Sequence, residues 1–162
     1  MKEIQLTKGQ FAIIDDDDYE MISKNKWAAS HGEVGKIYAV KTLNMGGGRR
    51  KRIYMHRVIM NAPLDKQVDH KNGNKLDNRR SNLRLCSKNE NMRNRQRYSR
   101  NTSGSKGVRW YGYNGHSHWV ARIVVNRKNI HLGYFDRKID AVGAYNTAAI
   151  RYHKEFAVLS SL

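Results

Sequence analysis

Four polar side chains between residues 69 and 91 have types and spacing that could do metal-assisted chemistry. Asp69 and His70 are adjacent, Asn82 follows His70 by twelve residues, and Asn91 follows nine residues later. Asp69 and Asn91 offer hard oxygen ligands, suited to Mg²⁺ or a similar cation that keeps most of its waters and grips a phosphate. His70 is then left as a base for water, while the metal stabilises charge on the departing 3′ oxygen. The set predicts phosphodiester hydrolysis.

The local pattern predicts which elements bring these residues together. "QVDH" is typical of a short strand, the Asn-Gly pair after it of a turn, "LRLC" of a second strand, and "SKNE" of a capping box that opens a helix. This order would place Asp69 and His70 near Asn91 in the first helical turn. Asn82 lies just before the second strand, where it could fix the loop or hold the imidazole. The other loop asparagines are expected to serve turns alone: Asn72, Asn74 and Asn78.

Residues 56–94 also resemble a known family. The stretch "HRVIMNAPLDKQVDHKNGNKLDNRRSNLRLCSKNENMRN" resembles an HNH endonuclease of the ββα-metal class, in the Asn-rich branch found among phage and intron homing endonucleases. The resemblance implies that His70 is the general base and Asn82 its orienter, with Asp69 and Asn91 as ligands of one divalent metal ion. Asn91 stands where many relatives place His, and its amide oxygen favours Mg²⁺ or Mn²⁺ over softer ions.

His56 stands at the start of this stretch and admits two roles. It either contacts phosphate or holds the helix that it begins against the core. The sequence leaves both roles open.

The chain carries a large positive charge. Its 162 residues hold 31 lysines and arginines against 14 acidic residues, a formal charge of +17, and the pI is near 10.2. The surplus is largest in residues 53–100, where 12 basic residues face four acidic ones. Such an excess repels itself in the folded state unless a polyanion is near, so nucleic acid is the favoured partner class. A merely soluble basic surface is the alternative.

Apolar content, cysteine usage and the N-terminal sequence bound the class of protein. Apolar residues make up 39% of the chain, enough for modest cores in one ordinary domain or two small ones. The single Cys86 can form no internal disulfide and excludes a cysteine-based zinc site. "MKEIQLTKGQ" lacks the apolar segment of a signal peptide, and no apolar run is long enough to cross a bilayer. We expect a soluble cytoplasmic protein, in a bacterial or phage-infected cell if the resemblance holds.

Composition divides the chain into two modules. The stretch 93–106, "RNRQRYSRNTSGSK", has many basic residues, no hydrophobic periodicity and Ser/Gly punctuation, which is typical of a linker. Residues 1–95 are expected to form a nuclease module with a β-rich N-terminal extension, and residues 96–105 the basic linker. Residues 106–162 form the second module.

The N-terminal extension is predicted to be mostly strand. "EIQLTKGQFAII" predicts strand with a Lys-Gly turn, and the acidic cluster Asp15 to Asp18 is expected to cap a short helix through about Trp27. "KIYAVKTL" and "RKRIYM" predict strands flanking "NMGGGRR", a Gly-rich loop without the GK[ST] ending of nucleotide-binding loops. Arg49 and Arg50 in this loop are available to meet phosphate.

The second module predicts three strands and a helix. Apolar residues alternate onto one strand face: Val108, Trp110, Trp119, Ala121, Ile123, Val125, Ile130 and Leu132. The other face carries polar and basic residues: Arg109, Tyr111, Arg122, Asn129 and His131. The helix is expected to begin at an Asp136 cap and to pack a stripe against the apolar face: Ala141, Tyr145, Ala148 and Tyr152.

Residues 106–159 resemble the plant ethylene-response-factor (APETALA-type) DNA-binding domain. The similar stretches are "GVRW", "WVARI", "HLGYF" and "AAIRYHKEFAVL". The resemblance implies that the polar sheet face named above reads bases in duplex DNA. Arg122 stands where plant members commonly have Glu, and Val124 replaces an Arg, so the plant target sequence cannot be transferred. Arg93 and Lys106, at the ends of the basic stretch, are expected to contact phosphate.

These features together predict an α+β chain: a ββα-metal nuclease module with a β-rich N-terminal extension, followed by a three-stranded antiparallel sheet packed on one helix. The expected function is site-directed, metal-dependent cleavage of duplex DNA, with one Mg²⁺ or Mn²⁺. The alternatives are a non-catalytic DNA-binding regulator that retains a nuclease fold, and a basic RNA-binding protein. No membrane contact and no obligatory protein partner are expected, and a monomer is compatible with the sequence.

Overall fold

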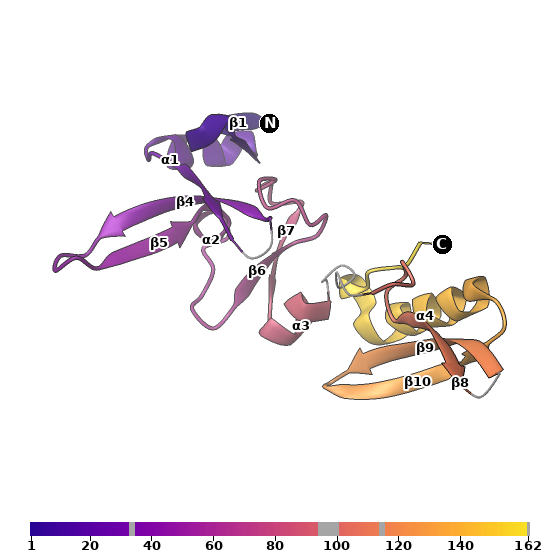
Figure 1. Cartoon of the computed structure of the whole chain (residues 1–162). Coiled ribbons are helices and arrows are strands. Elements are labelled where there is room, and N and C mark those ends of the chain that lie inside the picture. Colours follow the sequence, from indigo (N-terminus) through magenta and orange to yellow (C-terminus); the bar gives the residue numbers. More distant parts are fainter. Residues whose placement is uncertain (33–34, 94–100, 114–115, 162) are drawn as a thin grey trace. The chain divides into compact units, whose positions relative to one another are not determined.

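The protein has two compact units, Met1–Lys88 and Asn89–Leu162, as Figure 1 shows for the whole chain. The computed structural model describes residues 1–32, 35–93, 101–113 and 116–161. Helices and strands occur in both units, so the predicted α+β class is confirmed. Half of the predicted linker 96–105, residues 96–100, lies outside the described residues. Within the described ranges, no helix is long and apolar enough to cross a membrane.

The first unit consists of three small antiparallel sheets and short helices. Its elements are β1 (Lys2–Gln5), η1 (Thr7–Gly9), β2 (Phe11–Ile14), η2 (Asp16–Asp18), α1 (Tyr19–Ser23), β3 (Ala28–His31), β4 (Ile37–Asn44), β5 (Arg50–Tyr54), α2 (Met55–Ile59), β6 (Gln67–His70) and β7 (Leu83–Cys86). The sheets are β1-β2, β3-β4-β5 and β6-β7. The strands predicted in the N-terminal extension and on both sides of the catalytic loop are confirmed.

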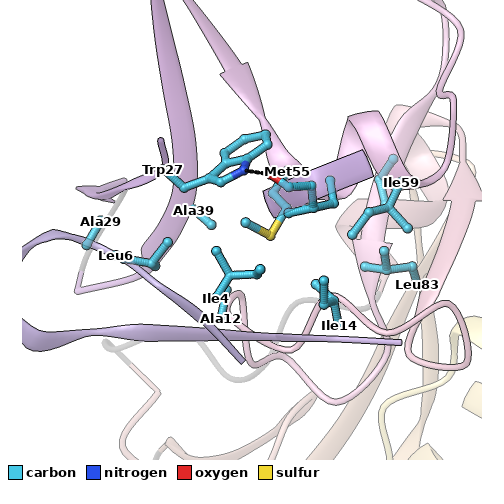
Figure 2. Packing of buried hydrophobic residues seen from close by; sticks show 12 residues of the cluster. Ile4, Leu6, Ala12, Ile14, Trp27, Ala29, Ala39, Met55, Ile59 and Leu83 are labelled. Atoms are coloured by element: carbon cyan, nitrogen blue, oxygen red, sulfur yellow. Dashed lines mark hydrogen bonds between the residues drawn. The ribbon is translucent and has the colours of Figure 1, made fainter. Parts of the chain in front are cut away.

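One apolar core joins these elements, as Figure 2 shows. Alternation along β1 and β2 turns Ile4, Ala12 and Ile14 inward, and all three are buried. Met55 of α2 and Leu83 of β7 belong to the same cluster. The core therefore packs the N-terminal extension, α2 and the β6-β7 hairpin together.

The helix predicted after the acidic segment is present, but it is shorter than expected and the acidic side chains do not cap it. Helix α1 ends at Ser23 instead of near Trp27, and no side chain of the Asp cluster caps it. The indole N–H of Trp27 donates to the carbonyl of Ile22 at 2.8 Å, which stabilises a turn where the helix would have continued. Asp18 is instead buried and accepts hydrogen bonds from the Arg80 guanidinium at 3.0 and 2.7 Å. Tertiary pairing thus replaces capping.

The second unit is a three-stranded antiparallel sheet with one long helix on it. Its elements are β8 (Val108–Tyr113), β9 (His116–Val125), β10 (Lys128–Phe135), α4 (Lys138–His153) and η3 (Lys154–Phe156), and α3 (Lys88–Arg93) precedes them across the boundary between the units. The strand order is β10-β9-β8. Figure 1 shows α4 along one face of this sheet.

The apolar pattern of this unit is confirmed except at Trp110, which is 53% exposed and lies outside the core cluster, with its ring 5.0 Å from that of Trp119. Val108, Ala121 and Ile123 of the sheet cluster with Ala141 and Tyr145 of α4. The predicted helix cap is wrong. The residue before α4 is Arg137, no side chain caps the helix, and the Asp136 side chain is 97% exposed. Instead, the guanidinium of Arg137 donates two hydrogen bonds of 2.8 Å to the carboxylate of Asp140 in the first turn of the helix.

Candidate active site

The β6-β7 hairpin positions the predicted catalytic pair. Antiparallel register sets Asp69 opposite Arg84 and His70 opposite Leu83. The chain turns immediately after His70, because Gly73 donates its N–H to the His70 carbonyl at 3.0 Å. Gly73 has a φ of +81°, a conformation that glycine adopts without strain, so the predicted Asn-Gly turn is confirmed.

Asn82 fixes the loop between the two strands. Its Oδ1 accepts the backbone N–H of Asn72 at 3.0 Å, and its Nδ2 donates to the carbonyl of Asp77 at 2.8 Å. Of the two roles that the sequence left open, the structure shows the fixing of the loop. The contact with the imidazole that was predicted for Asn82 is made by Asn78.

Asn78 holds the ring of His70. Its Nδ2 donates to the Leu76 carbonyl at 3.2 Å, and its Oδ1 lies 3.3 Å from His70 Nε2. An amide oxygen only accepts hydrogen bonds, so the tautomer that forms this contact carries its proton on Nε2, and its basic nitrogen is the buried Nδ1. The expectation that Asn78 serves a turn alone is therefore wrong. No local pattern marks this residue, because its contact depends on the path of the whole loop.

The N-terminal extension supports the same loop. The N–H of Ile13 in β2 donates to the Leu76 carbonyl at 2.9 Å, and the Ile13 carbonyl accepts the N–H of Asn78 at 2.8 Å. The N–H of Arg80 donates to the Asp15 carboxylate at 2.8 Å. The extension therefore fixes the backbone that presents Asn78 to His70.

Burial keeps His70 neutral at neutral pH. The side chain is 1% exposed, and its pKa falls to about 4 with burial as the main cause. The charge of Lys75 lowers this pKa further, whereas the hydrogen bond with Asn78 and the carboxylates of Asp69 and Asp77 raise it. A neutral imidazole can take a proton from water, which is the task predicted for His70.

Asp69 forms a buried ion pair with Arg84. Nε and Nη2 of Arg84 donate to Asp69 Oδ2 at 2.9 and 2.8 Å, and the two side chains are 11% and 1% exposed. The sequence analysis missed Arg84, although the antiparallel hairpin that it predicted places one residue of the second strand opposite Asp69. The pair holds the carboxylate beside the catalytic loop.

His56 packs against His70. The ring centroids are 5.0 Å apart with an angle of 82° between the planes. Burial, and then the charges of His70, Lys75 and Arg57, lower the pKa of His56 to about 3. A ring that stays neutral at pH 7 cannot pair as a cation with phosphate, so the structure favours the structural role of the two predicted for His56.

The burial of His56 makes stability sensitive to acid. The folded-state pKa of about 3 lies below the usual value of 6.5, so below pH 6.5 the unfolded chain binds a proton that the folded chain does not. This contribution to the unfolding free energy is constant above pH 6.5 and should fall by about 2 kcal/mol by pH 5. Urea unfolding at pH 7 and at pH 5 measures this effect. The unfolding free energy of His56→Phe should fall between the two pH values by about 2 kcal/mol less than that of the wild type. An equal pH dependence in both proteins would contradict the assignment.

The second predicted metal ligand lies in α3. Asn91 is half-buried there and belongs to the second unit, whereas Asp69 belongs to the first. The positions of the two units relative to one another are not determined, so the ligand role of Asn91 stays a prediction. Among the side chains that the structure describes, no group of three or more His, Cys, Asp or Glu residues could hold a metal ion.

The predicted base-reading residues share one face of the second unit's sheet. Antiparallel pairing sets Arg122 of β9 opposite His131 of β10, and Asn129 lies two residues before His131 on the same side. On β8, the guanidinium of Arg109 lies 5.5 Å from the centre of the Tyr111 ring. All five of these predicted residues are exposed.

Tyr134 joins this face and was missed in the sequence. A bulge between His131 and Gly133 shifts the alternation of β10, so Tyr134 pairs with Val120 and Phe135 packs inward. Tyr134 is 61% exposed, and its ring centroid lies 4.7 Å from that of His131. Gly133 is the one signal in the sequence that could have suggested a bulge.

The predicted phosphate contacts flank the linker. Arg93 ends α3, and its side chain lies outside the described residues. Lys106 is half-buried, and burial lowers its pKa to about 8, so it is still mostly charged at pH 7. The phosphate contacts of both residues stay predictions.

The sequence around this site matches those of known proteins. A family model described as HNH endonuclease matches residues 54–93, which contain His56, His70 and Asn82. Over 151 residues the chain is 31% identical to an uncharacterized HNH endonuclease of Acanthamoeba polyphaga mimivirus. The matched stretch covers 93% of this chain and 74% of the relative. No solved structure matches the chain. With the β6-β7 hairpin and its Asp-His pair in place, the chain belongs to the HNH endonuclease family.

Proposed function

We propose that the protein is a site-directed, metal-dependent DNA endonuclease of the homing type, of phage or bacterial origin. Its membership in the HNH family supports hydrolysis of DNA. The observation that carries the proposal is the buried, neutral His70, whose Nε2 is held by Asn78 so that Nδ1 is the basic atom. The formal charge of +17 suits a polyanionic substrate.

The proposed reaction begins at His70. Nδ1 takes one proton from a water molecule, the hydroxide attacks the phosphorus, and the P–O3′ bond breaks. The 3′ oxygen leaves with the bonding electrons and takes a proton from solvent, so the products are a 5′-phosphate and a 3′-hydroxyl. The negative charge of the bound phosphodiester raises the pKa of His70 and makes the ring a better base than it is without DNA.

The donor set suits a hard divalent cation. Asp69 offers a carboxylate and Asn91 an amide oxygen, and a site with few carboxylates is typical of Mg²⁺, which keeps several waters and binds substrate oxygens. When bound, the ion stabilises negative charge on the departing 3′ oxygen. In the protein, Arg84 orients the Asp69 carboxylate through two hydrogen bonds to Oδ2.

One experiment separates this function from its rivals. The full chain is incubated with duplex DNA and with RNA of the same sequence, in Mg²⁺, in Mn²⁺ and in a chelator. We expect cleavage of the DNA with either metal and none with the chelator. Binding of DNA without cleavage would indicate a regulator that retains the nuclease fold, and a preference for RNA would indicate an RNA-binding protein.

We further propose that the second unit directs the nuclease to its site, as its resemblance to the ethylene-response-factor domain implies. Residues 101–162 alone should bind duplex DNA without cutting it. Arg109→Ala and Arg122→Ala should blur the preferred sequence, because a side chain that reaches base edges typically supplies about 1–3 kcal/mol of discrimination. Lys106→Ala or Arg93→Ala should weaken binding to all sequences alike and reduce its salt dependence.

Selection of bound sequences from a random DNA pool, repeated for each variant, measures these effects. Unchanged preference in the Arg109 and Arg122 variants would remove the outer sheet face from site recognition. A fragment that ignores DNA would assign recognition to residues 1–95.

A further inference from the structure

Four aromatic rings meet where β4, β5, α2 and β6 come together. Tyr38 and Tyr54 form an edge-to-face pair with centroids 5.7 Å apart, and His56 lies 5.9 Å from Tyr38 and 5.4 Å from Tyr54. His70 packs on this group through His56 at 5.0 Å and Tyr38 at 6.5 Å. The imidazole of His70 therefore contacts the rings of His56 and Tyr38 and the side-chain oxygen of Asn78.

The hydrogen bond that His70 Nε2 donates to Asn78 does not by itself fix the imidazole. At 3.3 Å between Nε2 and Asn78 Oδ1 it is long, so it leaves the ring some rotation about the Cβ–Cγ bond. A neighbouring ring that stands at 82° to the imidazole removes this rotation, because turning the plane would bring the two rings into contact. His56 is in this place.

The surroundings of His56 fit a neutral ring that acts by packing. The residue is 7% exposed, and its ring packs against those of Tyr38, Tyr54 and His70. Burial lowers its pKa to about 3, which favours the uncharged ring at neutral pH. A charged His56 would repel the proton that His70 has to accept, whereas a neutral aromatic ring does not oppose it.

We propose that His56 is a positioning residue, which packs edge-to-face on His70 and fixes the plane of its imidazole, so that Nε2 keeps its hydrogen bond to Asn78 and Nδ1 is held in place as the base. The inference rests on the proposed role of His70 as general base. It assigns to His56 an effect on turnover that exceeds its contribution to the core of the first unit.

The test compares His56→Ala, which removes the ring, with His56→Phe, which keeps a neutral ring. The matched control is Ile59→Ala, which removes a buried aliphatic side chain of the apolar core from the same helix, α2. Turnover of duplex DNA in Mg²⁺, DNA affinity and the melting temperature are measured for each protein. All rates are taken at a temperature where every variant is folded.

We expect His56→Ala to lower kcat by about 10–100-fold, because misplacing a catalytic group by about 1 Å has an effect of this size. KM and DNA affinity should stay within about twofold, since a neutral buried ring contributes little to phosphate binding. His56→Phe should keep most of the turnover. Ile59→Ala should lose melting temperature and keep kcat. Equal kcat values in His56→Ala and Ile59→Ala would overturn the proposal, and so would a His56→Phe protein as slow as His56→Ala.

Two further measurements keep the test decisive if His56→Ala does not fold. His56→Leu fills the site without an aromatic ring and should be slow, and a leucine variant as fast as wild type would overturn the proposal. Added imidazole should restore cutting to His70→Gly but not to His56→Gly, because only the former lacks the base; rescue of both would contradict positioning. If His70→Ala cuts like wild type, the proposed function fails; if only the His56 variants are unaffected, His56 positioning alone fails.

Discussion

Replacing His70 by alanine should lower the cleavage rate of duplex DNA by about 10²- to 10⁴-fold, the usual contribution of a general base. DNA affinity should change by no more than about twofold, because a neutral imidazole adds little to binding of the phosphate backbone. The physical reason for this expectation is the state of the His70 ring. It is buried, its Nε2–H donates to Asn78 Oδ1, and burial holds its pKa at about 4, below the usual 6.5. Cleavage assays and gel shifts on one preparation measure both quantities.

Two other loop variants calibrate this result. Asn78→Ala should lower the rate by about 10–100-fold, since it removes the hydrogen bond that orients the base. Asn74→Ala is the matched control, because its side chain accepts the N–H of Leu76 in the same loop and does not contact His70. Near-normal cutting by His70→Ala would remove this histidine from the mechanism. Equal losses in the Asn74 and Asn78 variants would show that only the shape of the loop matters.

Replacing Asp69 by asparagine should raise the concentration of Mg²⁺ or Mn²⁺ needed for half-maximal cutting by about 10–100-fold. Excess metal should restore part of the activity, because a weakened ligand lowers metal affinity before it removes the chemistry. Asparagine is preferred to alanine here, because it keeps the size of the side chain and an oxygen that can accept hydrogen bonds from Arg84. Cleavage rates over a metal titration give the midpoint.

Arg84→Gln is the control for this experiment. It breaks the same ion pair and no longer orients the Asp69 carboxylate, so it should lower the melting temperature and raise the metal midpoint, but by less than Asp69→Asn. Asn91→Ala should shift the midpoint in the same direction as Asp69→Asn if it is the second ligand. An unchanged midpoint in the Asp69 variant, or an equal shift in the Arg84 variant, would refute Asp69 as a ligand.

Local patterns predicted the elements that carry the site. The alternation in "QVDH" and "LRLC" and the Asn-Gly turn between them gave the β6-β7 hairpin, and Gly73 has the positive φ that such a turn needs. The alternation of apolar residues along β8 and β9 predicted that Val108, Ala121 and Ile123 lie on the face that packs on α4. These features depend on neighbours a few residues apart, and a sequence displays such neighbours directly.

Contacts between distant residues were beyond such patterns. The Asp15–Asp18 cluster was expected to cap a helix, which is the common local use of acidic residues, yet Asp18 pairs with Arg80, 62 residues away. The grip of Asn78 on His70 depends on Ile13 holding the loop backbone. In the first case the local capping preference is worth about 1 kcal/mol, and the charge-assisted pair with Arg80 outweighs it. In the second case, backbone hydrogen bonds with a distant strand place the side chain.

The outer face of the second unit shows how one residue can change a parity argument. Arg122, Asn129 and His131 lie where alternation puts them, but the bulge before Gly133 moves Tyr134 onto the same exposed face. A bulge inserts one residue into the strand, so every position after it changes sides. Tyr134 therefore belongs among the residues whose substitution is tested for DNA preference.

Analysis of the cleavage products in ¹⁸O-labelled water tests the central claim most directly, because it reports which bond breaks and what attacks. A duplex DNA is cut by the full chain in Mg²⁺, and the new ends are identified by mass spectrometry. Attack by water activated at His70 predicts a 5′-phosphate that carries one labelled oxygen, a 3′-hydroxyl without label, and no product in a chelator. A 3′-phosphate, an unlabelled 5′-phosphate or cutting that persists in the chelator would contradict metal-dependent hydrolysis at this site.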